Sequence, residues 1–168
     1  KSLAISRAYS RMGFVPLDFN LSSALEEAFT TQVAAYYDPR THIFHVLDRR
    51  HAPTSRNPKG NEVIAHELVH ALQDQNWDLK SRSSYQPGKG DETLALACLA
   101  EGDATSLMMD FVLADKGQTA LDLPEATMRE LMTNGMTGPS ISNVPHILRT
   151  TLVAPYIDGL SFVHRLRR

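Results

Sequence analysis

Residues 61–75 read Asn-Glu-Val-Ile-Ala-His-Glu-Leu-Val-His-Ala-Leu-Gln-Asp-Gln. Asn61 is a typical helix N-cap, and neither Gly nor Pro follows within the stretch, so it predicts a helix over these residues. In a helix, positions i and i+4 lie one above the other, about 5–6 Å apart between Cβ atoms. His66 and His70 therefore share one face. We expect an apolar side to pack on the core while the two histidines face a cleft, with Ile64, Ala65, Leu68 and Leu72 forming that side.

Two imidazoles with this spacing can converge on one zinc ion, with Zn–N distances of about 2.0–2.1 Å. Glu67 follows His66 and is turned about 100° around the helix, so it can reach a water on the metal without being a ligand. This spacing is typical of a general base. The alternative is a pair of ordinary helix histidines beside a surface glutamate.

A catalytic zinc site needs a third protein ligand. Glu101 is the best candidate because its neighbours one and two turns away on a predicted helix carry no charge. Burial of an unpaired carboxylate costs several kcal/mol, so Glu101 needs a partner, either a divalent cation or an Arg or Lys from elsewhere. Asp103 lies on another side of that helix, where it could accept the second ring N–H of a ligating histidine or serve as a structural cap or pair. Cys98, one turn before Glu101, is more typical of a small buried hydrophobe than of a ligand.

The remaining segments predict a mainly helical α+β chain with one small sheet. Pro39 in the Asp38–Thr41 turn, with β-formers on both sides, indicates a hairpin. We expect a single domain with an N-terminal lobe over residues 1–76 and a helical lobe over 91–168. The expected elements are helices at 2–12, 23–31 (with a Ser23/Glu26 capping box), 61–75, 91–116 and 124–134, strands at 33–37 and 42–47, loops at 49–60, 77–90 and 135–143, and a helix from Pro145 that breaks or kinks at Pro155.

The composition is that of a soluble globular protein, with 42% hydrophobic residues, 21% charged residues and a net charge of −2. This charge argues against nucleic acid as a partner, because non-specific binding to phosphates needs a basic excess. The longest apolar run, Leu94 to Ala100, is far shorter than the roughly 20 residues that span a bilayer. A lone cysteine excludes an internal disulfide. Because the sequence begins with Lys1, the location stays open, including secretion or association with the cell envelope after loss of an upstream segment.

His66-Glu67-x-x-His70, followed by Glu101-Gly102-x-Ala104, resembles the gluzincin metallopeptidases, zinc proteases whose third ligand is a glutamate on the next helix. The Glu-Gly-x-Ala run is similar to the third-ligand motif of the zinc aminopeptidases. Residues 64–75 and 101–104, together with Pro155-Tyr156-x-x-Gly159-x-x-Phe162-Val163, resemble a little-characterised bacterial family of metalloproteases over roughly residues 30–168. Thirty residues separate His70 from Glu101, more than in the aminopeptidases, so residues 77–90 are expected to be an inserted loop at the active site.

The resemblance implies a zincin-like fold, one Zn²⁺ per chain and a peptide or protein substrate. It also implies that the hairpin before the helix binds substrate, which would involve Ile43, Phe44 and His45. The alternative is a strand inside the sheet. Gluzincins use a downstream Tyr or His to stabilise the oxyanion, which points to Tyr156 or His146; a tyrosine bonded to backbone is the other interpretation of Tyr156. Related sequences continue past the last motif, so part of the cleft could lie outside this chain.

Three hypotheses remain open. The first is a zinc-dependent peptidase in which Glu67 takes a proton from the attacking water and delivers it to the leaving amine. The second is a non-catalytic zincin-like module that holds zinc and binds peptides through its sheet edge. The third is a helical interaction protein in which the motif arises by chance. Metal content and turnover distinguish the three.

Overall fold

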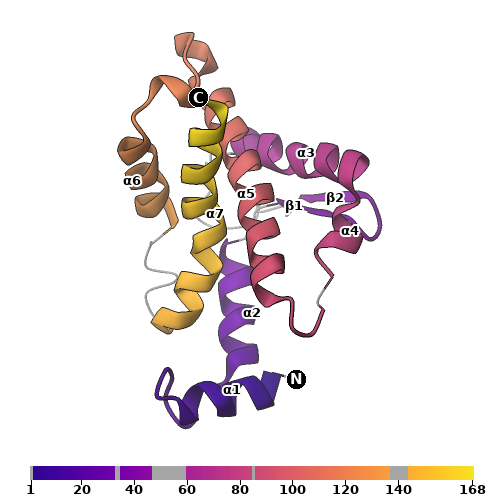
Figure 1. Ribbon diagram of the computed structural model, residues 1–168, viewed down its shortest axis with the longest axis vertical. Coiled ribbons are helices and arrows are strands. Elements are labelled where there is room, and N and C mark those ends of the chain that lie inside the picture. Colours follow the sequence, from indigo (N-terminus) through magenta and orange to yellow (C-terminus); the bar gives the residue numbers. More distant parts are fainter. Residues whose placement is uncertain (1, 33–34, 47–59, 85, 137–143) are drawn as a thin grey trace, which may run out of the picture. The chain divides into compact units, whose positions relative to one another are not determined.

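The computed structural model describes residues 2–32, 35–46, 60–84, 86–136 and 144–168 (Figure 1). These residues form a mainly helical α+β chain, and their one sheet is a two-stranded antiparallel hairpin, which confirms the expected fold class. The elements are α1 (Ser2–Arg11), α2 (Leu21–Gln32), β1 (Ala35–Asp38), β2 (Ile43–Val46), α3 (Gly60–Trp77), α4 (Leu79–Arg82), α5 (Gly90–Leu113), two short 3-10 helices (Ala114–Lys116 and Ala120–Asp122), α6 (Glu125–Met136) and α7 (His146–Arg167).

The chain forms two compact units, each built from segments that are far apart in the sequence. The first comprises residues 1–33 and 134–153, and the second comprises residues 34–133 and 154–168. This division differs from the expected lobes at 1–76 and 91–168. The physical reason is that α7 runs through Pro155 as one helix, so its first turns belong to one unit and its later turns to the other.

In the first unit, α1 and α2 pack around a small apolar cluster of Leu21, Val144 and Leu148. The capping box expected at Ser23 is wrong. The helix begins at Leu21, and the side-chain oxygen of Asn20 accepts a hydrogen bond from the backbone N–H of Ser23 (3.2 Å). Asn is among the best N-cap residues, and it precedes the serine here, so it takes the capping position.

In the second unit, α3 packs against both α5 and strand β1 (Figure 1). The hairpin register pairs Ala35 with Val46 and Asp38 with Ile43, around the turn that Pro39 predicts. The inner face of α3 is largely polar. His66 and Gln73 are buried beside Val69, whereas Leu68 and Leu72 are 53% and 56% exposed. The expectation that these two leucines pack on the core is therefore wrong.

A pair of glycines brings α5 and α7 into backbone contact. A Cβ atom on Gly102 would lie 2.2 Å from the carbonyl carbon of Gly159, and one on Gly159 would lie 2.1 Å from the carbonyl oxygen of Cys98. Only glycine allows so close an approach. On its other side α7 faces α6, where Leu160 packs with Met128 in a second apolar cluster (Figure 1).

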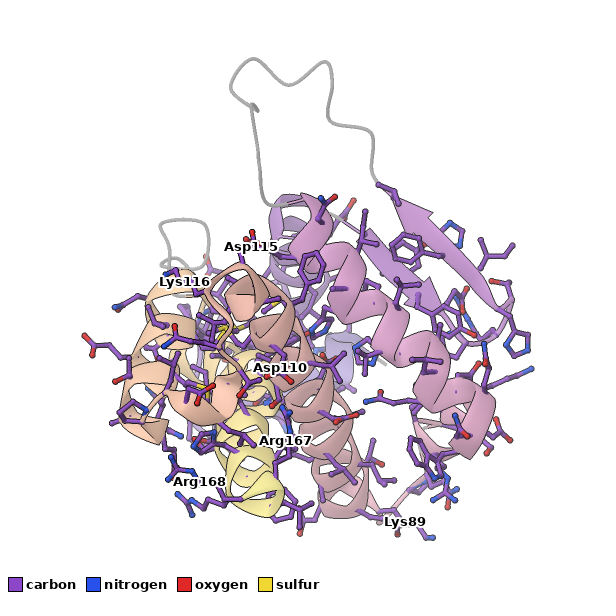
Figure 2. The ribbon with its side chains drawn as sticks, turned by 90° about the horizontal axis from the view of Figure 1, so that it is seen from above. Lys89, Asp110, Asp115, Lys116, Arg167 and Arg168 are labelled. Carbon is purple, nitrogen blue, oxygen red and sulfur yellow. The ribbon has the colours of Figure 1, made fainter. Side chains whose placement is uncertain are left out.

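An ion pair fastens the C-terminal end of α7 to α5. Arg167 donates from Nη2 to Asp110 (2.7 Å) and from Nη1 to the hydroxyl of Ser106 (Figure 2). Asp110 also accepts a hydrogen bond from the backbone N–H of Ala120 (2.7 Å), which fixes the second 3-10 helix against α5. Helix α5 is thus held to its neighbours on both sides of Glu101.

The remaining expected boundaries hold within one to three residues, with two changes: α7 continues through Pro155 without a break, and the segment 77–90 contains a helix. That segment is not wholly irregular, since α4 forms within it on an N-cap by Asp78, which accepts from the backbone N–H of Ser81 (3.2 Å). The basic loop expected over 49–60 lies outside the described residues, apart from Gly60. No α-helix in the described part of the chain combines the length and apolar character that crossing a bilayer requires.

Candidate metal centre

Helices α3 and α5 bring His66, His70 and Glu101 together in one cluster. The Nε2 atoms of the two histidines lie 3.1 Å apart, and the Oε2 atom of Glu101 lies 3.0 Å from the first and 3.3 Å from the second. The pair comes from the i, i+4 spacing on α3, and the carboxylate comes from the facing side of α5. The three side chains expected to hold a metal therefore meet at their donor atoms.

Gln73 determines which ring nitrogen of His70 carries the proton. Its amide nitrogen donates both hydrogens, to the carbonyl oxygen of Ala100 (3.0 Å) and to Oδ2 of Asp103 (2.9 Å). The amide oxygen must then be the atom 2.9 Å from Nδ1 of His70, and that oxygen can only accept. In the neutral imidazole the proton therefore sits on Nδ1, and the lone pair of Nε2 points into the cluster.

This arrangement fits a divalent cation. The Nε2 lone pair of neutral His70 and the carboxylate oxygen of Glu101, 3.3 Å apart, repel each other unless a proton or a metal ion lies between them. Around a tetrahedral zinc ion with bonds of about 2.0–2.1 Å, adjacent ligand atoms are about 3.3–3.4 Å apart. The observed separations of 3.0–3.3 Å are close to this spacing. The donor set, two imidazoles and one carboxylate, is one that zinc uses with a fourth position open.

When the cluster holds a proton instead of a cation, its histidines and its carboxylate stabilise each other's charged forms. Burial opposes the charge on Glu101, but the hydrogen bonds and charge of His66 and His70 outweigh it and lower the pKa of this carboxyl group to about 2. For His70 burial opposes protonation, and the bond and charge of Glu101 prevail, so its pKa is raised. Among the residues that the structure describes, Glu101 pairs with the two histidines and with no Arg or Lys, so a divalent cation would compete at this carboxylate with a proton on His70.

Glu67 lies next to the cluster and is held by the hairpin. Its Oε2 atom accepts a hydrogen bond of 2.8 Å from the backbone N–H of Tyr37 in β1. Burial raises the pKa of Glu67, although this hydrogen bond and the nearby imidazoles lower it in part. A raised pKa suits a group that must take up and release a proton near neutral pH.

Tyr156, the first candidate for oxyanion stabiliser, lies beside the cluster on α7. Its ring stacks on that of His66, with 6.0 Å between centroids. Burial, followed by the carboxylates of Glu101 and Glu67, raises the pKa of its hydroxyl, so the group stays protonated and can donate. His146, the second candidate, is exposed and belongs to the other unit, where it begins α7.

Asp103 and Cys98 lie outside the cluster of donor atoms. The place expected for Asp103, next to the second ring N–H of a histidine, is taken by the amide oxygen of Gln73, and Asp103 instead accepts from that amide. The side chain of Gln73 lies between the ring of His70 and the carboxylate of Asp103, so Asp103 bonds to Gln73 instead of to the ring. Cys98 is partly buried, and its backbone carbonyl packs against Gly159; it is not part of the described metal-binding cluster.

The strand nearest the cluster is β1. Because the N–H of Tyr37 points to Glu67, the backbone groups of Ala35 and Tyr37 face α3, and those of Tyr36 and Asp38 face β2. Ile43, Phe44 and His45, the residues expected to bind substrate, lie on β2. The residues expected to bind substrate therefore lie one strand further from the cluster than β1, and their role stays a prediction.

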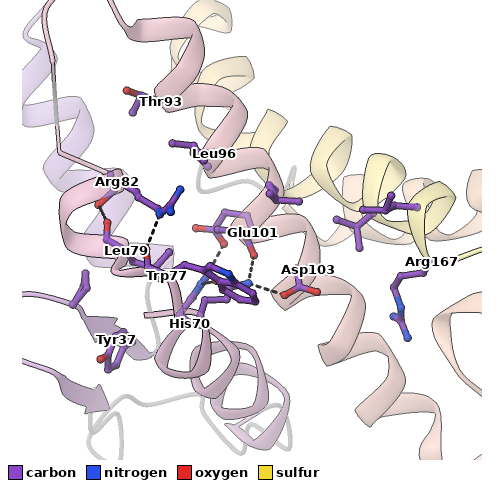
Figure 3. A pocket seen from close by; sticks show the side chains of 18 residues that line it. Tyr37, His70, Trp77, Leu79, Arg82, Thr93, Leu96, Glu101, Asp103 and Arg167 are labelled. Atoms are coloured by element: carbon purple, nitrogen blue, oxygen red, sulfur yellow. Dashed lines mark hydrogen bonds and ion pairs between the residues drawn. The ribbon is translucent and has the colours of Figure 1, made fainter. Parts of the chain in front are cut away.

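A cleft of about 590 Å³ opens beside the cluster (Figure 3). His70, Gln73 and Glu101 form part of its wall, and Leu96 and Trp77 line it further along. Tyr37 of the hairpin and Leu79 of α4 contribute as well. The cleft gives an extended ligand with apolar groups a route to the donor atoms.

Three residues of this site were missed by the sequence interpretation: Gln73, Asp74 and Tyr37. Asp74 is buried, with Oδ2 accepting from the hydroxyl of Tyr37 (2.8 Å) and from Nδ1 of His42 (2.9 Å). A signal for the first two was present, since both lie on the same turn of α3 as His70 and are polar in an apolar helix.

Comparison of this chain with protein-family models, with curated proteins and with solved structures finds no match. The functional interpretation therefore rests on the geometry of the site.

Proposed function

We propose that this chain is a zinc-dependent peptidase of the gluzincin type, with a zincin-like arrangement of hairpin, motif helix and ligand helix. The observation that carries the proposal is the triangle of two Nε2 atoms and one Oε2 atom with edges of 3.0–3.3 Å. His66, His70 and Glu101 would hold the ion. When bound, zinc supplies a Lewis acid that lowers the pKa of water to about 7 and polarises a carbonyl group.

Residues of the protein would carry out proton transfer, stabilisation of the oxyanion and binding of the substrate backbone. Glu67 takes the proton from the attacking water and delivers it to the nitrogen of the leaving amine, so that the peptide C–N bond breaks. The hydroxyl of Tyr156 donates a hydrogen bond to the oxygen on which negative charge develops. The substrate backbone would pair with the edge of β1 through groups other than the Tyr37 N–H, which Glu67 engages.

The first experiment separates metal binding from turnover. The chain is purified without chelators, its zinc content is measured, and hydrolysis of an unfolded protein substrate is followed. Glu67→Gln should retain about one zinc per chain and lose hydrolysis by about 10²–10⁴-fold, because a general base contributes that much. Glu62→Gln, in the first turn of the same helix, should behave as the wild type.

Each competing hypothesis predicts a different result. A wild-type chain with stoichiometric zinc and peptide affinity but no turnover is a zinc-bound module that binds peptides. A chain without zinc carries the motif by chance. Wild-type activity of Glu67→Gln would refute the mechanism.

A further inference from the structure

Asp74 is a buried carboxylate that the peptidase mechanism leaves without a role. Its side chain is only 3% exposed, and it accepts three hydrogen bonds: from the hydroxyl of Tyr37 (2.8 Å), from Nδ1 of His42 (2.9 Å) and from the backbone N–H of Leu79 (2.9 Å). A carboxylate can only accept, so His42 presents its Nδ1–H to it. Burial of a charge costs several kcal/mol without such donors, so the ionised Asp74 favours the conformation in which all three donors point to it.

The three donors come from three elements. Tyr37 lies on β1, His42 lies in the turn that follows, and Leu79 begins α4. His42 adopts φ 57°, in the left-handed region, where the turn closes through a hydrogen bond from its N–H to the carbonyl oxygen of Asp38 (2.8 Å). One anion on α3 therefore fastens the hairpin and α4, and Tyr37 and Leu79 are both walls of the cleft.

Tyr37 connects Asp74 to the candidate site, because it forms a hydrogen bond with Asp74 and another with Glu67. Its side-chain hydroxyl is bound to Asp74, and its backbone N–H is bound to Oε2 of Glu67 (2.8 Å). The hydroxyl bond ties Tyr37 to α3 through its side chain and the N–H bond ties it through its backbone, so the two bonds together limit how far β1 can move from α3.

We propose that Asp74, Tyr37 and His42 form a clamp that holds β1 against α3 and thereby orients Glu67, so that all three are positioning residues. The inference rests on the proposed function. The hydrogen bonds of the clamp are separate from those that hold the metal ligands, which come from Gln73 and from within the cluster. Loss of the clamp should therefore lower turnover and leave zinc affinity unchanged.

The test compares two Tyr→Phe variants of adjacent residues. Tyr37→Phe removes the hydroxyl bound to Asp74 but retains the backbone N–H. Tyr36→Phe is the matched control, because that ring is 43% exposed and stacks on His45 instead. For Tyr37→Phe we expect kcat to fall between about 10-fold and 10²-fold, the usual effect of a misplaced catalytic group, with zinc affinity unchanged within twofold. Hydrogen exchange of residues 35–46 should become faster, and the control should match the wild type in all three measurements.

Asp74→Asn provides a second variant, which keeps the shape and removes the charge, and it should have the same effects. Unchanged kcat and unchanged hydrogen exchange in Tyr37→Phe would overturn the proposal. So would a parallel fall in zinc affinity, because the residues would then act through the metal ligands. If the wild type binds zinc and lacks turnover, the proposed function fails. Hydrogen exchange of residues 35–46 then still decides whether the clamp holds the hairpin.

Discussion

At the scale of single residues, Gln73 determines the tautomer of His70, which lies one turn away on α3. By donating both amide hydrogens to α5, it leaves only its oxygen for His70, and the ring must present a bare Nε2 to the cluster. Bonds of this kind to metal-ligating histidines typically change metal affinity by 10–100-fold.

Gln73→Met keeps the length of the side chain and removes its hydrogen bonds. We expect zinc affinity, measured by competition with a chromophoric chelator, to fall by about 10–100-fold. Gln75→Met, on the exposed side of the same helix, is the control. Equal affinities of the two variants would mean that the tautomer of His70 is set in some other way.

The residues of the site differ in how far the sequence could predict them. His66, Glu67 and His70 follow from the geometry of one helix, and Glu101 follows from the cost of burying a carboxylate. The role of Gln73 depends on the carbonyl oxygen of Ala100, 27 residues away, and no local pattern encodes that contact. Of the two roles considered for Asp103, the structure shows a pairing with a side chain of α3, the amide of Gln73, and this partner also lies far away in the sequence.

At the scale of elements, α3 buries polar side chains beside Val69 and leaves two of its leucines exposed. The periodicity of the leucines indicates a helix correctly, but Leu68 and Leu72 are exposed and the polar side faces inward. The hydrophobic pattern assumes that burial is driven by apolar area. Here the inward face is occupied by the cluster and by Asp74, so the helix itself could be predicted but its orientation could not.

The contact of α5 with α7 yields a prediction about Gly102. In Gly102→Ala the new Cβ would lie 2.2 Å from the backbone of Gly159, so the two helices must separate. We expect unfolding to become easier by about 1–3 kcal/mol or more, the range for overpacking, as measured by urea denaturation. Zinc affinity should fall as well, because Glu101 precedes the contact.

Gly135→Ala is the matched control for that experiment. Gly135 lies in α6, and a Cβ atom there would meet nothing within 4 Å. Alanine favours helix over glycine by about 1 kcal/mol in a helix interior, so stability should be unchanged or slightly higher. If Gly102→Ala is as stable as the wild type and binds zinc equally well, the close approach of α5 and α7 does not constrain the position of Glu101.

At the scale of the whole molecule, the two units interleave along the chain, and α7 contributes to both. A single sequence predicts elements from local patterns, but the partner of each face depends on contacts between distant segments. Tyr156 illustrates this limit: its motif was visible, whereas its place beside His66 follows from the Gly102–Gly159 contact.

His164 makes the stability of the fold depend on pH. It is 1% exposed, and in the described part of the chain neither ring nitrogen has a hydrogen-bond partner. Burial, followed by the charge of Arg168, lowers its pKa below the ordinary 6.5, although Glu125 opposes this. The folded protein therefore holds the ring neutral at a pH where the unfolded chain takes up a proton. Stability from this group is present above pH 6.5 and is lost as the pH falls below it.

One proton contributes a slope of at most about 1.4 kcal/mol per pH unit. His164→Leu removes both the titration and the unpaired nitrogens, so its free energy of unfolding should exceed that of the wild type, and the excess should grow between pH 6.5 and 5.5. Urea denaturation at both pH values, with zinc absent from both proteins, measures the difference. His146→Leu, at an exposed position at the start of α7, is the control and should follow the wild-type slope. A constant difference between His164→Leu and wild type would show that His164 is protonated equally in the folded and unfolded chain.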